Sequence, residues 1–382
     1  MKFAHMADCH LGGWRQPELN ELNFKSFQFA LKKVALEKVD FLIIAGDLFD
    51  SPYPPIDTLK DTFEEFRKLK EAKIPVFIIA GSHDYSVSGK TFLDVLEKAG
   101  FCTNVSTIEE RAGKLMLHPT IHNNVALYGY PGRKSGLEVE DVGRIVLQDA
   151  PGLYKILVLH TTLADAMPNL PIYAVDEKKL PKVDYVALGH LHIHYHKENR
   201  IYAGPTFPNS LSELEDLGAG SFYIVENGKP RKEIIQLKKT AILDIEINDA
   251  HTATEKILKQ MESEDIEDKI VLLKIYGIIE KGSTTDIDYV PIEVFARKKK
   301  VFVLLKTTTK LFIAEPALKM DITETVNMEE AIVAKFKGKN EHIFNHLIEP
   351  LLRSLHIPRQ EDEKAAVFEE RLKAEAKKVL EL

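Results

Sequence analysis

Five short apolar runs in the first 192 residues are each followed within three residues by aspartate or histidine, and this feature constrains the fold most strongly. The runs cover residues 2–7, 41–45, 76–80, 156–159 and 185–188. Behind the first three lie stretches with helical spacing, at residues 24–38, 58–70 and 91–99. Strands that alternate with helices predict an α/β protein. In such folds, ligand-binding side chains gather at the carboxyl ends of the strands.

The chain becomes rich in β-type runs after residue 100. These runs cover residues 114–118, 124–130, 155–160, 185–189, 200–203, 221–225 and 232–238. They predict a sheet or a pair of sheets covered on the outside by helices. From residue 241 the character changes, and we expect a small second α/β domain with strands at 241–247, 269–277 and 300–305 and a helix at 253–261. The section from about residue 327 is charged and has a helical pattern. Its final run, 360–382, either docks on a partner or lies on its own domain.

Composition excludes several classes of protein. The 382 residues are 45% hydrophobic, which excludes disorder as the main state. Cys9 and Cys102 are too few for a disulfide framework. No uncharged apolar run reaches the roughly 20 residues needed to span a bilayer, and the first residues do not resemble a secretory signal. The net charge of −7 argues against a large basic surface that coats nucleic acid, but bound divalent cations would supply positive charge locally.

The polar motifs at the strand ends carry the chemistry. Asp8 and His10 are two residues apart, which places both on one face of an extended segment, and an oxygen ligand beside an imidazole suits Mn, Fe or Zn. Asp47 follows Gly46 at the end of the second run, although an aspartate here could instead cap a helix. The remaining motifs are Gly81-Ser82-His83-Asp84, His160 and Gly189-His190-Leu191-His192. Apart from His83 and Asp84, the motifs offer two aspartates and four histidines, enough for two metal sites that share one carboxylate.

The five motifs resemble those of the calcineurin-like metallophosphoesterase superfamily: D-x-H, G-D-x-x-D, G-N-H-D, H and G-H-x-H. Residues 2–12 and 45–51 further resemble the archaeal SbcD-type DNA double-strand-break repair nucleases, the meiotic recombination nuclease family. The resemblance implies a four-layer sandwich of two central sheets flanked by helices, with a small α/β capping domain and a helical C-terminal segment. We expect a nuclease domain at 1–238, a capping, DNA-binding domain at 239–325 and an ATPase-binding segment at 326–382.

The resemblance also implies roles for single residues. One metal would be held by Asp8, His10, Asp47 and His192, and the other by Asp47, Ser82, His160 and His190. His83 would be the general acid, oriented by Asp84.

Two positions depart from the family pattern. Ser82 stands where the family has asparagine, and a hydroxyl is a shorter and weaker metal ligand than an amide oxygen. Asp50 stands where many nucleases of this branch have histidine. The first departure concerns the affinity for the second metal, and the second concerns the handling of duplex ends.

The activity implied is that of a two-metal DNA nuclease, a 3′→5′ exonuclease on double strands and an endonuclease on single strands. Histidine and carboxylate ligands favour Mn²⁺, with Mg²⁺ or Fe as alternatives. Trp14, Arg15, Arg133 and Lys134 are candidate DNA contacts, although simple surface charge would also explain the basic residues.

Partners are implied as well. Family members work as homodimers with an SbcC-type coiled-coil ABC ATPase. Residues 59–69 and 92–96 resemble the dimer helices, although their apolar positions could equally belong to the core. Residues 342–355 and 367–380 resemble the ATPase-binding segment. A cytoplasmic, nucleoid-associated location is expected, with no membrane contact. Three rivals remain: a small-molecule or cyclic-nucleotide phosphodiesterase, a non-catalytic scaffold for the ATPase, and a protein phosphatase.

Overall fold

The computed structural model describes residues 1–86, 91–133, 136–167, 173–314, 344–357 and 365–380. The chain forms two compact units, Met1–Ala314 and Glu315–Leu382. The boundary expected at residue 238 falls inside the first unit, between β15 (Lys229–Ile235) and β16 (Thr240–Glu246). The boundary expected at residue 325 lies outside the described residues.

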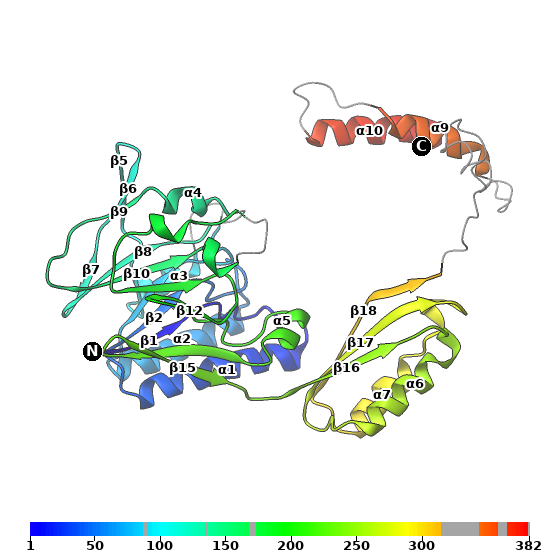
Figure 1. Cartoon of the computed structure of the whole chain (residues 1–382), viewed down its shortest axis with the longest axis horizontal. Helices are drawn as coiled ribbons and strands as arrows, with labels where there is room; N and C mark the ends of the chain where they lie inside the picture. Colours follow the sequence, from blue (N-terminus) through cyan, green and yellow to red (C-terminus); the bar gives the residue numbers. More distant parts are fainter. Residues whose placement is uncertain (87–90, 134–135, 168–172, 315–343, 358–364, 381–382) are drawn as a thin grey trace. The chain divides into compact units, whose positions relative to one another are not determined.

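The first central sheet contains the three strands that precede the Asp-rich motifs (Figure 1). Its order is β15-β14-β1-β2-β3-β4, in which β1 to β4 run parallel and β14 runs antiparallel to β1. These strands are β1 (Lys2–Met6), β2 (Phe41–Ala45), β3 (Val76–Ile79), β4 (Thr103–Asn104), β14 (Gly220–Glu226) and β15. The helices behind it are α1 (Pro17–Leu36), α2 (Ile56–Glu71) and α3 (Phe92–Lys98). The first of these begins seven residues earlier than the expected residue 24, because Pro17 is well suited to the first helical position.

The second central sheet carries the histidine motifs. Its order is β12-β13-β11-β10-β8-β7. Its strands are β7 (Thr120–His122), β8 (Val125–Tyr130), β10 (Tyr154–His160), β11 (Tyr185–Gly189), β12 (Tyr195–Lys197) and β13 (Arg200–Tyr202). Side chains such as Phe3 and Ile43 of the first sheet pack against Leu127 and Val158 of the second in one buried cluster. This packing sets the carboxyl ends of the parallel strands from both sheets beside one another.

The outer face of the second sheet differs from the all-helical cover expected. It is covered by the short helix α4 (Glu138–Val142) and by a three-stranded sheet of order β5-β6-β9. The small sheet consists of β5 (Ile108–Arg111), β6 (Lys114–Leu117) and β9 (Ile145–Leu147). Short 3₁₀ turns lie at Ala164–Ala166 and Glu177–Lys179. The four-layer architecture is confirmed, with a mixed rather than helical fourth layer.

The remainder of the first unit is a small α/β portion. Three parallel strands, β16, β17 (Ile270–Ile279) and β18 (Val303–Ile313), carry α6 (Ala250–Ser263) and α7 (Val290–Lys298) on one face (Figure 1). A 3₁₀ turn lies at Thr284–Asp286. The sequence analysis missed α7, although a proline in its first turn marks its start. The opposite face of the sheet packs on Trp14 and on α5 (Leu211–Asp216).

The second unit is helical in its described part, as expected. It contains a 3₁₀ turn at Asn345–Leu347, α9 (Ile348–Leu355) and α10 (Ala365–Leu380). Across the residues that the structure describes, no helix has both the length and the apolar character needed to cross a membrane.

Acid is expected to weaken the fold through His5, which is fully buried on β1 and bonded through Nδ1 to the Tyr185 hydroxyl at 3.0 Å. Burial lowers the pKa of His5 to about 3, despite a backbone hydrogen bond at Leu188 that acts in the opposite direction. The unfolded chain therefore binds a proton below about pH 6.5 that the folded chain does not take up until about pH 3. Stability falls in this window as the pH falls, by up to about 1.36 kcal/mol per pH unit from this residue.

Urea unfolding of metal-free protein at pH 4, 5 and 6 measures this effect. In the His5→Gln variant, the free energy of unfolding should fall less steeply with falling pH than in the native chain, by up to about 1.36 kcal/mol per pH unit. Equal slopes for the two proteins would contradict the assignment.

Candidate metal centre

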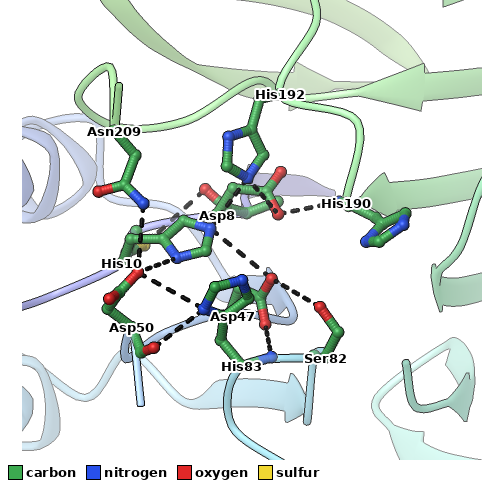
Figure 2. Close-up of polar contacts among 12 residues, drawn as sticks. Asp8, His10, Asp47, Asp50, Ser82, His83, His190, His192 and Asn209 are labelled. Atoms are coloured by element: carbon green, nitrogen blue, oxygen red, sulfur yellow. Dashed lines mark hydrogen bonds and ion pairs between the residues drawn. The ribbon is translucent and has the colours of Figure 1, made fainter. Parts of the chain in front are cut away.

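The five polar motifs converge at the carboxyl ends of β1, β2, β3, β10 and β11 (Figure 2). The loops after β1 and β2 are joined by backbone hydrogen bonds, from the Asp8 amide to the Gly46 carbonyl at 3.1 Å and from the His10 amide to the Asp47 carbonyl at 3.0 Å. The predicted metal-binding residues are therefore brought together by strand ends from both sheets.

Positive φ values are concentrated at the predicted metal-binding residues. Asp8, His10, Asp47, His190 and His192 all have positive φ values, between 43° and 101°. Side chains other than glycine adopt this region rarely and at a cost. The fold keeps five strained residues at one place, which favours a functional rather than a structural origin for the cluster.

The first predicted ligand set forms a compact group. Ligand atoms of Asp8, His10, Asp47 and His192 all lie within 4.8 Å of one another. Nε2 of His10 lies 2.9 Å from Nε2 of His192 and 3.6 Å from Oδ2 of Asp47. Oδ2 of Asp8 is buried without a hydrogen-bond partner.

The arrangement of the two imidazoles fits a bound cation. Nδ1 of His10 donates to Asp50 Oδ1 at 3.0 Å, and Nδ1 of His192 donates to Glu213 Oε1 at 3.1 Å. A ring that carries its hydrogen on Nδ1 alone presents a lone pair at Nε2, and two such lone pairs 2.9 Å apart repel unless a proton or a cation lies between them. Neighbouring donors on one ion, with bonds of about 2.1 Å, have a similar separation. Together with the unpartnered carboxylate oxygen of Asp8, these residues fit a divalent cation.

The second predicted ligand set is less closely gathered. Nε2 of His160 lies 3.0 Å from Asp47 Oδ2 without a hydrogen bond, and the Ser82 hydroxyl lies 3.4 Å from the same oxygen. The His190 ring centroid is 5.0 Å from that of His160, and the ring lies apart from the cluster in Figure 2. Asp47, Ser82 and His160 thus share one place, and His190 stands at its edge.

Asp47 and His160 each stabilise the ionised form of the other. Burial raises the pKa of Asp47, but the neighbouring His160, His10 and His83 outweigh burial and hold it below its ordinary value. Burial lowers the pKa of His160, whereas Asp47 and Asp8 raise it to about 10. The pair is therefore ionised without metal, and a metal ion bound at His160 would have to displace this proton.

The two histidines of the last motif differ in their environments. Burial and the charge on His160 lower the pKa of His190 to about 4. Burial also acts to lower the pKa of His192, but Asp8 and Glu213 raise it to about 8. A metal ion at this motif would therefore meet more competition from a proton at His192 than at His190.

His83 lies at the mouth of the site. It lines an open pocket of about 570 Å³ with Asp50, Ser82, Arg133 and His190. Its side chain is 47% exposed, its amide donates to Asp47 Oδ1 at 2.7 Å, and its Nδ1 donates to the Asp50 carbonyl at 2.9 Å. The Asp50 carboxylate lies 3.5 Å from the same nitrogen.

Asp84 has different partners from those predicted. Its buried carboxylate accepts three backbone N–H groups, from Gly81, Leu48 and Phe49, at 3.0–3.1 Å. Burial and the charge on Asp47 raise its pKa to about 6, against the effect of these three donors. Asp84 thus ties the loop after β3 to the loop after β2, and the groups that hold the His83 ring come from Asp50 instead.

The candidate DNA contacts lie in different environments. Trp14 is only 8% exposed, and its indole N–H donates to the Pro208 carbonyl at 2.8 Å, so its ring is not available to stack on a base. Arg15 is exposed. Arg133 lines the pocket, pairs with Asp141 at 3.1 Å and lies over the Tyr130 ring. Lys134 lies outside the described residues.

Three polar residues beside the metal centre were not expected to contact the predicted metal-binding histidines or their partners. Asp50 contacts His10, Glu213 contacts His192, and Asn209 donates to Asp50 Oδ1 at 3.2 Å. The sequence does carry a helix-start signal at Ser210 and Glu213, the serine and glutamate of a capping box. That signal predicts a helix and says nothing about a nearby histidine.

The chain is similar to one described family and to several curated proteins. Residues 1–194 match the family model described as calcineurin-like phosphoesterase. The chain is 26% identical to the DNA double-strand break repair protein Mre11 of Methanosarcina mazei over 94% of this chain and 58% of that protein. It is 33% identical to the protein of the same name from Methanococcus maripaludis over 56% of this chain and 60% of that protein.

A bacterial relative has no assigned function. The uncharacterized metallophosphoesterase YhaO of Bacillus subtilis is 27% identical over 59% of this chain and 57% of that protein. The chain spans about three fifths of the length of these curated relatives.

Proposed function

Because the chain belongs to the calcineurin-like phosphoesterase family, we propose that it is a phosphodiester hydrolase that uses two divalent metal ions to cut DNA. The observation that carries the proposal is the group of Asp8, His10, Asp47 and His192, with two imidazole Nε2 atoms 2.9 Å apart. A divalent cation between these two nitrogens and the Asp8 and Asp47 carboxylates would remove the repulsion between the lone pairs, which supports the proposal.

The residues that would hold the ions follow the geometry above. Asp8, His10, Asp47 and His192 hold the first ion, and Asp47, Ser82, His160 and His190 hold the second. When bound, the two ions neutralise phosphate oxygens and make water a nucleophile near neutral pH. Mn²⁺ is the proposed metal, with Mg²⁺ or Fe as alternatives, because imidazole and carboxylate ligands suit these ions.

His83 is the proposed general acid. Its Nδ1 hydrogen is engaged by the Asp50 carbonyl, so Nε2 is the nitrogen that can deliver a proton. The Asp50 carboxylate 3.5 Å away stabilises the positively charged ring. His83 would give its proton to the departing 3′ oxygen, which suits an imidazole near neutral pH.

DNA is the proposed substrate, with 3′→5′ cleavage from double-strand ends and endonuclease cleavage of single strands. The names of the two archaeal relatives support this choice. Arg133 supports it within the pocket, because a guanidinium beside the metal centre would hold a phosphate. The exposed basic run at 297–300 would extend the contact to the proposed capping domain, residues 239–325.

Two protein partners belong to the proposal. Exposed apolar side chains at the start of α2 and on α3, Tyr53, Ile56 and Val95, would pair with a second copy of the chain. The segment 326–382 would bind an SbcC-type ABC ATPase, and Leu352 and Leu355 on α9 leave apolar surface for such a contact. A cytoplasmic, nucleoid-associated location is part of the same proposal.

Restoring the family's asparagine is expected to strengthen the second metal site. In Ser82→Asn, an amide oxygen reaches further than the hydroxyl and is a better ligand. The affinity for the weaker Mn²⁺ ion should rise about tenfold, equivalent to about 1.4 kcal/mol. Calorimetric titration with Mn²⁺ measures this, and Ser51→Asn, which changes another serine of the same pocket, is the control. An unchanged affinity would remove Ser82 from the proposed ligand set.

Degradation of a labelled DNA duplex by the purified chain tests the proposed function. Shortening from the 3′ end with Mn²⁺, and none in EDTA, is the expected result. Cleavage of a small chromogenic phosphodiester without any cleavage of DNA would favour the small-molecule phosphodiesterase. No hydrolysis of either substrate by protein that binds Mn²⁺, with or without the ATPase, would favour a scaffold.

A further inference from the structure

The first metal's two imidazoles are both held at Nδ1 by carboxylates that are not themselves in the predicted ligand sets. Asp50 Oδ1 accepts from His10 at 3.0 Å, and Glu213 Oε1 accepts from His192 at 3.1 Å. A carboxylate in this position fixes the tautomer and the ring orientation of a metal-binding histidine. The two carboxylates come from different parts of the chain, the loop after β2 and the helix α5.

Glu213 uses both of its oxygens. Oε1 accepts from His192 and from the Ser210 hydroxyl at 3.2 Å, and Oε2 accepts from the Asn209 amide at 2.8 Å. Ser210 in turn caps α5 by accepting the Glu213 amide. The carboxylate is therefore held from several sides, and its direction toward His192 is fixed by the start of the helix.

Asn209 extends the same connection to the second imidazole. Its side-chain amide donates to Asp50 Oδ1 at 3.2 Å, and that oxygen also accepts from His10 (Figure 2). A single segment, residues 209–213, thus touches the partners of both histidines. The backbone amide of Asn209 donates to Glu213, and the side-chain amide of Asn209 donates to Asp50.

Buried apolar side chains next to the segment 209–213 fix its position. Phe207 and Leu214 are buried in a cluster with Trp14, Ile270 and Leu305, which joins α5 to the face of the β16–β18 sheet. The Trp14 indole donates to the Pro208 carbonyl. A well-packed support of this kind holds the polar groups above it in one place, as a pre-organised site requires.

We propose that Glu213 is a positioning residue for the first metal ion, acting on His192 directly and, through Asn209 and Asp50, on His10. This inference rests on the metal-binding part of the proposed function. In Glu213→Gln, one carboxylate oxygen becomes an NH₂ group, which cannot accept a hydrogen bond. This group then faces another donor, either the His192 ring N–H or the Asn209 backbone N–H. The ligand histidine then loses its fixed orientation although the volume and the packing of the side chain are kept.

Metal binding by Glu213→Gln tests the proposal. Outer partners of ligand histidines contribute about 10–100-fold to metal affinity, so the affinity for the tighter Mn²⁺ ion should fall by about that factor in calorimetric titration. The matched control is Glu215→Gln, two residues along the same helix, because Glu215 pairs with Lys274 and not with the metal centre. It should bind Mn²⁺ like the native chain.

A spectroscopic readout separates positioning from general destabilisation. The visible absorption bands of bound Co²⁺ report the ligand geometry, and they should change in Glu213→Gln but not in Glu215→Gln. Asn209→Ala, which keeps the backbone amide and removes only the link to Asp50, should lower the affinity several-fold with a smaller spectral change. It also tests the proposal if Glu213→Gln fails to fold.

The outcomes distinguish this inference from the proposed function. Native Mn²⁺ affinity and a native Co²⁺ spectrum in a folded Glu213→Gln protein, or in Asn209→Ala where the first variant does not fold, would overturn the positioning role. Such a result leaves the DNA cleavage test unaffected. Loss of affinity in Glu213→Gln would support the inference even if the native chain cut no DNA.

Discussion

Replacing Asp47 by asparagine is expected to lower the rate of metal-dependent DNA cleavage by about 10³-fold or more, because Asp47 is the one carboxylate common to both proposed ligand sets. It lies close to ligand atoms of His10, His160 and Ser82. An asparagine keeps an acceptor for the His83 amide but loses the charge and one metal-binding oxygen. Affinity for both Mn²⁺ ions should fall together, by more than about 100-fold.

Calorimetric titration and cleavage assays on the same preparation check this prediction. Asp61→Asn, an exposed position on α2, serves as the matched control and should leave both quantities unchanged. Circular dichroism shows whether each variant is folded. A folded Asp47→Asn protein that binds Mn²⁺ and cuts DNA within about tenfold of the native chain would mean that the two ions do not share this residue.

His83→Ala is expected to lower cleavage of DNA by about 10²–10⁴-fold while Mn²⁺ affinity stays unchanged. The imidazole is absent from both proposed ligand sets and lines the pocket. Its role as an acid matters only where the leaving oxygen needs a proton. Bis(p-nitrophenyl) phosphate releases a nitrophenolate that leaves without one, so the variant should hydrolyse this substrate at close to the native rate.

The comparison of the two substrates is the control within the experiment. An equal loss on both would show that His83 acts on the ions or on the phosphate rather than on the leaving group. A drop in Mn²⁺ affinity in the same variant would place it among the metal-binding residues.

Much of the site was predictable because strand ends in a parallel sheet meet at one edge. Once residues 41–45 and 76–80 are identified as strands, Asp47 and Ser82 must lie near each other. The same reasoning brings His160 and His192 together, and the structure places all four at the expected edge. Local pattern was sufficient here because the residues directly follow regular elements.

The rest depended on contacts between segments that are far apart in the chain. Glu213 meets His192 across 21 positions, and Asn209 meets Asp50 across 159, through bonds that no local pattern encodes. Trp14 follows the first motif in sequence and suggests an exposed ring, but packing against the β16–β18 sheet buries it. Asp84 sits beside His83 in sequence, yet three backbone amides hold its carboxylate elsewhere. The strained backbone of Asp8, His10 and Asp47 is also invisible in the sequence.

A crystal soaked in Mn²⁺, with anomalous diffraction recorded at the manganese absorption edge, tests the central claim most directly. The account predicts two anomalous peaks, both within bonding distance of the Asp47 carboxylate, one also bonded to His10 and His192 and the other to His160. A single peak, or a pair of peaks that does not share Asp47, would contradict the two-metal site from which the proposed reaction follows.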